Sequence, residues 1–422
     1  MKKIIPTIKS ILIISLAILA IYQVGRLWLV NLTNRNFVLY LQARFPPSAP
    51  DGQSAFAQPF RIISGNGNGI FDIRYSEIAN SEEWVFGEEI INEILRSGEF
   101  QSDSAATFET ILAEPVLIYE YAFNMCAETF ARALGRRNGA VLTEAGIESF
   151  TRIAVQRSSE RRVFFINDSQ IWEYSLSSFP PRLALLEASI QPASESPMHF
   201  IATENGFVPR VDGDGFFYTA VSVENPFSDA QGLFTFSHIR SRVEPFFDNP
   251  ASIFPSVSVD NVYTFSNRNT TVQYLENAAL EYTSYRTIGR AAQENFMADF
   301  SAALAFLNDD PFVINEIYLR NHDTRGRAHV FRFNYVIDNH PLILTEPWHT
   351  RIYPRCTDPL FAPIEITVDQ GRVVRYRRLV YTFHSDGIMW KDAAALERNE
   401  HFTLGFPIDI GPAIELQVLL ES

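Results

Sequence analysis

The chain has 422 residues, and its 35 basic and 49 acidic side chains give a formal net charge of -14 at pH 7. That charge argues against a phosphate-binding surface, and we therefore expect no nucleic-acid partner. Hydrophobic residues at 46% and aromatic residues at 13% are typical of a folded body with more than one core, and they argue against a disordered chain.

The most hydrophobic stretch is residues 8–30, IKSILIISLAILAIYQVGRLWLV. About 20 apolar residues in a helix cross the hydrocarbon core of a bilayer. Lys2, Lys3 and Lys9 lie before the apolar run that starts at Ile11. The aromatic residues Tyr22 and Trp28 suit the outer headgroup boundary. We predict a cytoplasmic stub and single transmembrane anchor at residues 1–30 in the cell membrane, with the bulk of the chain extracellular.

The alternative to an anchor is a cleaved signal peptide, because the uninterrupted apolar core of residues 8–30 is short. Against cleavage, Gln23-Val24-Gly25 is a poor site for a signal peptidase, which prefers small residues.

The body behind the anchor is predicted to be α+β, with antiparallel sheets and packed helices. We divide it into a proline-containing stalk, a first α+β domain, a central mostly-β domain, and a C-terminal domain of a helix and an antiparallel sheet. The respective ranges are 31–58, 59–195, 198–285 and 286–422.

In the first domain, the glycine-rich residues 64–69 (SGNGNG) lie between two predicted strands. Because no helix follows them to receive a phosphate, we interpret them as a hairpin turn rather than a nucleotide loop. Residues 82–96 predict a helix that Ser81 caps. A strand, a helix and a second hairpin complete the domain at 116–123, 126–134 and 163–176.

The two later domains read as strands with one helix each. The predicted helices cover 236–247 and 287–307, and the main strands are 198–203, 207–211, 216–223, 262–266, 271–275, 280–283, 313–320, 328–337, 364–368 and 372–383. Residues 212–215 (DGDG) hint at calcium, but the following residues supply no oxygen ligands, which favours a turn.

Two stretches echo each other at the ends of these helices, PFFDNP at 245–250 and FLNDDP at 306–311. Two related units in tandem would explain the echo, and so would the common chemistry by which proline stops a helix.

Enzyme signatures are absent from the sequence, which has no G-x-S-x-G, H-E-x-x-H, Walker or C-x-x-C motif. The histidines of the last domain have no neighbours at metal-ligand spacing and read as exposed or capping residues: His322, His329, His340, His349 and His384. We therefore predict no catalytic, metal-binding or cofactor-binding residues. Cys126 and Cys356 could pair outside the cell, or be two buried thiols.

Three stretches in combination resemble the YycH family. They are VLIYEYAF at 116–123, the strands VYTFS, VQYL and ALEYT between 262 and 283, and the final hairpin of 364–368 with 373–379. The likeness runs from the anchor to about residue 385. Residues 135–160 are more charged than the family pattern, and the tail after residue 386 does not align.

YycH proteins are membrane-anchored extracytoplasmic regulators of the WalK/WalR (YycG/YycF) two-component system of low-GC Gram-positive bacteria. The resemblance implies a non-enzymatic regulator without a cofactor. It implies association with the sensor histidine kinase and a YycI-like protein through transmembrane helices and adjacent extracellular parts. That association would modulate the activity of the kinase and hence the expression of genes of cell-wall metabolism.

On that reading the anchor also recognises a partner helix, through small residues and hydrogen-bonding groups. Ser10 and Ala17 share a face, and Ser15 and Gln23 offer polar groups, so these four are the candidate partner-binding residues. The alternative is that they belong to a plain anchor. Two other functions stay open, an anchored cell-envelope enzyme with a deep polar pocket and an extracellular ligand-sensing module.

Overall fold

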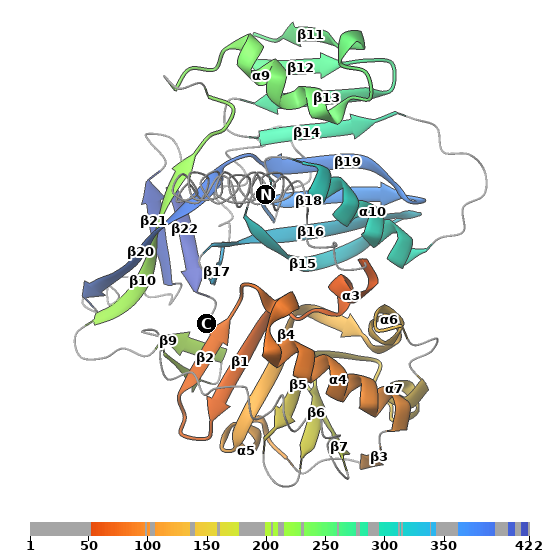
Figure 1. Ribbon diagram of the computed structural model, residues 1–422, viewed down its shortest axis with the longest axis vertical. Helices are drawn as coiled ribbons and strands as arrows, with labels where there is room; N and C mark the ends of the chain where they lie inside the picture. Colours follow the sequence, from red (N-terminus) through yellow and green to blue (C-terminus); the bar gives the residue numbers. More distant parts are fainter. Residues whose placement is uncertain are drawn as a thin grey trace, which may run out of the picture. The chain divides into compact units, whose positions relative to one another are not determined.

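The computed structural model describes residues 52–97, 99–101, 106–135, 140–157, 161–176, 199–203, 206–209, 215–228, 232–259, 261–275, 279–285, 295–310, 313, 315–337, 339–342, 362–392, 404–409 and 415–420. The predicted anchor and residues 31–51 of the predicted stalk lie outside these ranges. Residues 52–58 are part of the folded body rather than a stalk, because they contain helix α3 (Gly52–Ala57), in which Phe56 and Ala57 are buried. Among the described residues, no helix has the length and apolar character needed to span a membrane. Gly52–Ser422 form one compact unit, and most of their described strands belong to two nine-stranded sheets (Figure 1).

The first sheet is antiparallel and has the strand order β3-β7-β6-β5-β4-β1-β2-β8-β9. Its strands are β1 (Arg61–Asn66), β2 (Phe71–Arg74), β3 (Glu99–Gln101), β4 (Pro115–Cys126), β5 (Ser149–Gln156), β6 (Arg162–Ile166), β7 (Ile171–Ser175), β8 (Phe200–Thr203) and β9 (Gly206–Pro209). The helices of this region are α3 (Gly52–Ala57), α4 (Glu82–Ser97), α5 (Phe108–Leu112), α6 (Ala127–Ala133) and α7 (Ala140–Glu144).

Both faces of the first sheet are apolar, because alternate residues of its strands enter different cores. In β4, Leu117 and Tyr119 pack with the buried stripe of α4, whereas Val116 and Ile118 pack with Ile111 of α5. The predicted helix at 82–96 is confirmed, and the backbone N–H of Trp84 donates to the hydroxyl of Ser81 at 3.1 Å. The glycine-rich residues 64–69 lie at the β1–β2 hairpin, as predicted.

Gly87 is the point at which α4 comes closest to the first sheet. A Cβ atom there would lie within 3.0 Å of the ring of Tyr119, whose hydroxyl donates to the carbonyl of Glu83 at 2.7 Å. The fully buried Tyr119 cannot move aside easily.

We therefore expect Gly87→Ala to destabilise the protein by about 1–3 kcal/mol through overpacking, although alanine is normally the better helix former. Urea unfolding measures the change. The substitution should become neutral or stabilising in a Tyr119→Leu background, and a stabilising effect of Gly87→Ala alone would contradict this packing.

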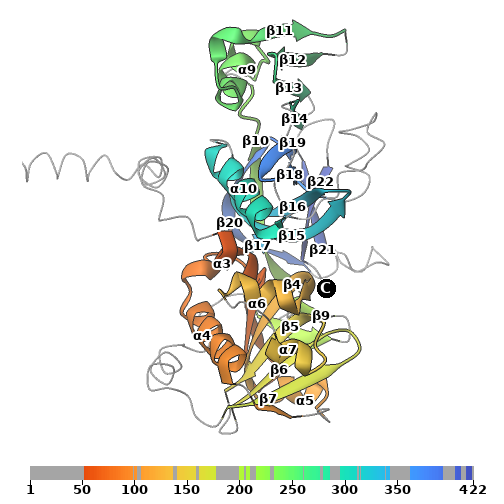
Figure 2. The ribbon, with the colours of Figure 1, turned by 90° about the vertical axis from the view of Figure 1, so that its right-hand side faces the viewer.

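The second sheet has the order β11-β12-β13-β14-β19-β18-β16-β15, with β17 also paired to β16. Its strands are β11 (Phe254–Val257), β12 (Val262–Ser266), β13 (Thr270–Leu275), β14 (Ala279–Ser284), β15 (Glu316–Arg325), β16 (Ala328–Ile337), β17 (His340–Pro341), β18 (Ile364–Asp369) and β19 (Arg372–Leu379). Helices α9 (Phe236–Val243) and α10 (Phe296–Asp309) lie on the same side of this sheet (Figure 2). Two small antiparallel pairs join β10 (Gly215–Glu224) to β20 (Thr382–Asp392) and β21 (Leu404–Asp409) to β22 (Glu415–Leu420).

The second sheet consists of two helix-plus-four-strand units that meet at β14 and β19. One unit contributes α9 and β11 to β14, the other α10 and β15, β16, β18 and β19, in reversed order across the sheet. At the meeting point, Tyr282 and Tyr376 are register partners, and Phe306 lies 5.1 Å from each of their rings. Phe246, in the stretch that echoes that of Phe306, is 6.1 Å from the Phe306 ring. Each of the two echoing stretches lies at or directly after the end of the helix of its unit and before the first strand of that unit, which favours tandem duplication.

The α+β class with antiparallel sheets is confirmed, and the divisions within it differ from those expected. The predicted boundary between residues 285 and 286 falls inside one sheet, because β14 pairs with β19. Strands β8 and β9 lie beyond the predicted boundary near residue 195 but belong to the first sheet.

Several predicted elements have different bounds; for example, the strand predicted at 313–320 is β15 at Glu316–Arg325, and the helix predicted at 236–247 is α9 at Phe236–Val243. Helix α10 begins at Phe296, where the side chain of Asn295 accepts from the backbone N–H of Ala298 at 3.2 Å, rather than at residue 287. The predicted strand 372–383 is two strands, since β19 ends at Leu379 and β20 starts at Thr382 and pairs with β10.

Candidate interaction surface

The predicted partner-binding residues Ser10, Ser15, Ala17 and Gln23 lie outside the described residues. Within the part of the chain that is described, no group of three or more histidine, cysteine or acidic side chains is arranged to hold a metal ion. The cysteine prediction is partly wrong, because Cys126 is an exposed free thiol and not a buried one. Cys356 lies outside the described residues.

The histidine prediction also differs at two positions. His329 and His340 are buried, rather than exposed. His329 lies at the start of β16 beneath α10, and its Nδ1 is 2.6 Å from the carboxylate of Asp299, which satisfies the ring. His349 lies outside the described residues.

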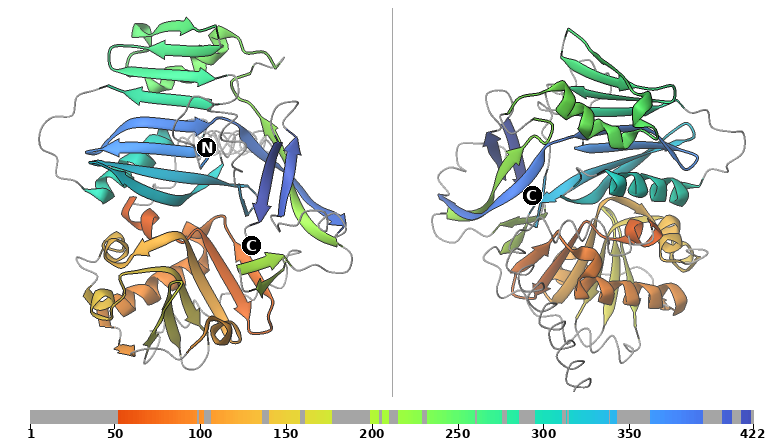
Figure 3. Two further views of the ribbon diagram at one scale, coloured as in Figure 1. Left: turned by 180° about the vertical axis from the view of Figure 1, so that it is seen from behind. Right: turned by 45° about the horizontal axis from the view of Figure 1, so that its top comes forward.

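A row of polar side chains lies on the face of the second sheet that points away from α9 and α10. The left view of Figure 3 shows this face of the sheet. One polar side chain from each of eight adjacent strands lies in register across this face. We call this set the polar row; in order from β15 to β11 it comprises Asn321, Arg332, Glu365, Arg377, Glu281, Gln273, Thr264 and Ser256. Cross-strand neighbours of this kind are close enough to hydrogen-bond.

Charged members of the polar row pair with one another. The Nε atom of Arg332 donates to Glu365 Oε2 at 2.8 Å, and that of Arg377 donates to Glu365 Oε1 at 3.1 Å. Arg332, Glu365 and Arg377 are 9%, 3% and 0% exposed, so this carboxylate and its two guanidinium groups are removed from water together. Further along, Glu281 accepts from Arg375, which lies in the neighbouring row, at 2.8 Å.

The polar row becomes more accessible towards β11, where its members are uncharged. Gln273 and Thr264 are half-buried and hydrogen-bond to each other at 3.3 Å, and Ser256 is exposed. The accessible part of the row can contact another folded surface through hydrogen bonds. The row offers no activated nucleophile, since each carboxylate in the row accepts from an arginine.

Other buried ion pairs lie within the hydrophobic cores. Beneath α10, Asp310 Oδ2 accepts from Arg378 Nη1 at 2.9 Å and from the Tyr376 hydroxyl at 2.7 Å, and burial raises the pKa of that hydroxyl. In the first sheet, burial alone would raise the pKa of Glu120, but Arg61 and Arg152 hold it below its ordinary value. Removal of one partner from such a buried ion pair leaves an uncompensated charge, which destabilises the fold.

Polar contacts join the end of β2 to the second sheet. The side-chain oxygen of Asn339 accepts from the backbone N–H groups of Tyr75 and Ser76 at 2.5 and 3.1 Å, and its nitrogen donates to the carbonyl of Ile73 at 2.8 Å. The φ angle of 64° at Asn339 belongs to the left-handed region, which asparagine tolerates. The carboxylate of Glu316 accepts from the backbone N–H of Glu77 at 2.8 Å.

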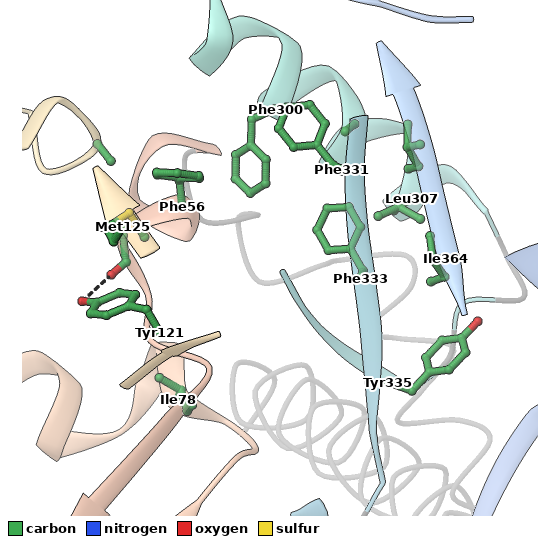
Figure 4. Packing of buried hydrophobic residues seen from close by; sticks show 14 of the residues in the cluster. Phe56, Ile78, Tyr121, Met125, Phe300, Leu307, Phe331, Phe333, Tyr335 and Ile364 are labelled. Carbon is green, nitrogen blue, oxygen red and sulfur yellow. Dashed lines mark hydrogen bonds between the residues drawn. The ribbon is translucent and has the colours of Figure 1, made fainter. Parts of the chain in front are cut away.

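An aromatic group lies beside these polar contacts. The ring of His322 on β15 is surrounded by Phe56 of α3, Phe123 of β4 and Phe296 of α10, at centroid distances of 6.0, 5.1 and 5.0 Å. Phe56 also meets Phe300 at 5.3 Å, so one hydrophobic cluster continues from the first sheet to α10 (Figure 4).

The position of His322 predicts a pH dependence of stability. Burial lowers the pKa of His322 below its ordinary value, nearby His329 lowers it further, and Asp323 opposes them weakly. The unfolded chain therefore takes up the proton first as pH falls through about 6.5. Stability from the neutral ring is complete above that pH and is lost as pH falls towards the folded-state pKa.

We expect His322→Phe, which keeps a ring in the aromatic group, to reduce the loss of stability on acidification. Urea midpoints of both proteins across this pH range measure the effect. Equal acid sensitivity of the two proteins would contradict it.

No protein-family model matches the sequence, and no curated protein matches it. Among solved structures, the fold is similar to that of YycH from Bacillus subtilis, with a TM-score of 0.47 and 11% sequence identity. The similarity covers 82% of this chain and 86% of the YycH chain. This is the family that the three sequence stretches resemble.

Proposed function

We propose that this chain is a single-pass membrane protein that regulates a two-component system without catalysing a reaction. Its N-terminus is cytoplasmic and its body extracellular, in a Gram-positive cell. It contacts a WalK-type sensor histidine kinase and a YycI-like protein, and so modulates signalling that controls cell-wall metabolism. The observation that carries the proposal is the chain order, in which the apolar residues 8–30 precede a body that contains the three family-like stretches.

The position of those stretches in the fold supports the proposal. Residues 116–123 lie in β4, the strands between 262 and 283 are β12 to β14, and the final hairpin is β18 with β19. Strand β4 lies in the interior of the first sheet, and β14 and β19 are the two strands that join the units of the second. The sequence likeness thus falls on the strands that organise both sheets.

The polar row supports a function that depends on contact with another protein. Its charged groups are matched within the sheet, and its accessible part towards β11 presents hydroxyl and amide groups. Such groups suit reversible recognition of another surface, because they exchange hydrogen bonds with water for hydrogen bonds with a partner at little net cost.

In-membrane crosslinking between the full chain and the sensor kinase tests the proposal. We expect a crosslink with the native anchor, and its loss when residues 8–30 are replaced by an unrelated apolar helix of equal length. A milder variant, with Ser10, Ser15 and Gln23 each changed to leucine, should weaken the crosslink while membrane insertion is retained.

An unrelated single-pass sensor kinase serves as the control partner and should not crosslink. Contact that survives full replacement of the anchor would refute recognition through the helix. Absence of any crosslink with the native protein would refute kinase contact itself.

A further inference from the structure

Charge is unevenly distributed along this acidic chain. Residues 1–50 contain six basic side chains and no carboxylate, so residues 51–422 carry a net charge of -20. Within that acidic body, the strands of the second unit of the second sheet reverse the balance. The described residues between 315 and 379 hold eight arginines and four carboxylates, namely Arg320, Arg325, Arg327, Arg332, Arg372, Arg375, Arg377, Arg378, Glu316, Asp323, Glu365 and Asp369.

Three of these arginines are exposed at the ends of two neighbouring hairpins. Arg325 and Arg327 flank the β15–β16 turn, and Arg372 follows the β18–β19 turn. The two turns are adjacent, since Arg327 Nη2 lies 3.2 Å from the carboxylate of Asp369. We call these three arginines the basic tips. Asp323 and Asp369 offset part of their charge, and the half-buried Arg320 and Arg375 lie behind them.

The basic tips lie close to the point at which the compact body begins. The backbone N–H of Gly371 donates to Asp299 in the first turn of α10, at 2.5 Å. In the same turn, Phe296 is 5.0 Å from the ring of Phe56 in α3. A short series of contacts therefore links the tips to α3, which starts at Gly52.

The number of residues between the predicted anchor and α3 limits how far this end of the body can lie from the membrane. Residues 31–51 are 21 residues, and a chain of that length cannot exceed about 70 Å. Hairpin ends beside α3 are within that reach. Electrostatic attraction between a protein and a membrane surface acts within a Debye length of about 8–10 Å at physiological salt.

We propose that the basic tips bind the anionic phospholipid headgroups of the membrane that holds the anchor. The inference rests on the proposed function, because it needs the chain to be anchored. Guanidinium groups bind phosphate oxygens through paired hydrogen bonds, and each arginine near an anionic surface strengthens binding by about fivefold. The rest of the body is predominantly acidic and is repelled by an anionic membrane surface. Electrostatic attraction to that surface therefore favours contact through the basic tips.

The test uses the full chain inserted in nanodiscs of phosphatidylcholine, either alone or mixed with phosphatidylglycerol. Amide hydrogen exchange is measured at residues 322–329 and 369–373. We expect slower exchange at both turns in the anionic discs, and loss of that difference at high salt. The triple variant Arg325→Glu, Arg327→Glu and Arg372→Glu should also abolish the difference, while exchange along β16 and β18 stays unchanged and shows that the sheet is intact.

A matched variant with the same net charge provides the control. Arg74→Glu, Arg96→Glu and Arg132→Glu reverse three arginines of the first-sheet region that are also exposed, and they should leave the protection intact. Equal exchange in both lipids, or equal effects of the two triple variants, would overturn the inference while leaving the anchor in place. Inorganic polyphosphate is also added to the neutral discs. If it slows amide exchange at the two turns, the basic tips bind a soluble polyanion, and the proposal that they bind membrane lipids is wrong. Failure of the chain to enter the discs would overturn the inference together with the proposed function.

Discussion

Replacing Glu365 with alanine is expected to destabilise the folded body by about 3–5 kcal/mol, because it leaves Arg332 and Arg377 charged and without their shared carboxylate. Arg377 is 0% exposed, so its guanidinium group has no access to water in the folded protein. Urea unfolding of the full chain in detergent micelles, followed by circular dichroism, measures the loss.

The matched control for Glu365→Ala is Glu281→Ala, in the same polar row two strands away. Glu281 and its partner Arg375 retain 21% and 37% of their side-chain exposure, so water can replace the lost pair. We expect that substitution to cost no more than about 1 kcal/mol. Equal losses at the two positions would contradict the burial of the charged end of the row.

A comparable loss is expected for Asp310→Ala, on the opposite face of the same sheet. The substitution leaves the Arg378 guanidinium, whose side chain is 1% exposed, and the buried Tyr376 hydroxyl without their common acceptor. An uncompensated buried charge of this kind costs about 3–5 kcal/mol.

The neighbouring Asp309 provides the control for Asp310, because it is exposed at the end of α10. Asp309→Ala should change the free energy of unfolding by no more than about 0.5 kcal/mol. Denaturant midpoints of the two variants decide the matter, and similar midpoints would show that Asp310 does not neutralise Arg378.

Features governed by neighbouring residues could be predicted from the sequence. Helix α4 has a capping serine, acidic residues in its first turn and apolar residues at helical spacing, so its bounds were predicted within one residue. The β1–β2 hairpin follows from glycines at positions that need positive φ, such as Gly67 and Gly69. The start of α10 could have been placed better, since Asn295 is a strong capping residue directly before the apolar spacing begins.

Features governed by distant pairing could not be predicted. The contact between β14 and β19 joins residues such as Thr283 and Arg375, which are far apart in sequence, and no local pattern specifies which strand edges meet. For the same reason the division into central and C-terminal domains separated strands of one sheet.

The polar row was missed because its members come from eight strands. One signal was present, since Arg375 and Arg377 lie two residues apart in β19 and alternate with Tyr376. That spacing indicates a strand with one polar face. The carboxylates that neutralise the arginines, Glu365 and Glu281, become visible only when the register is known.

The retention of residues 1–30 in the mature protein is the assumption on which both kinase contact and lipid binding depend. Intact-mass measurement of the protein extracted from the membrane fraction tests it most directly. We predict a mass that includes the whole apolar stretch, together with resistance to extraction by alkaline carbonate. A mature N-terminus near residue 25, in protein that carbonate or salt releases, would contradict the account.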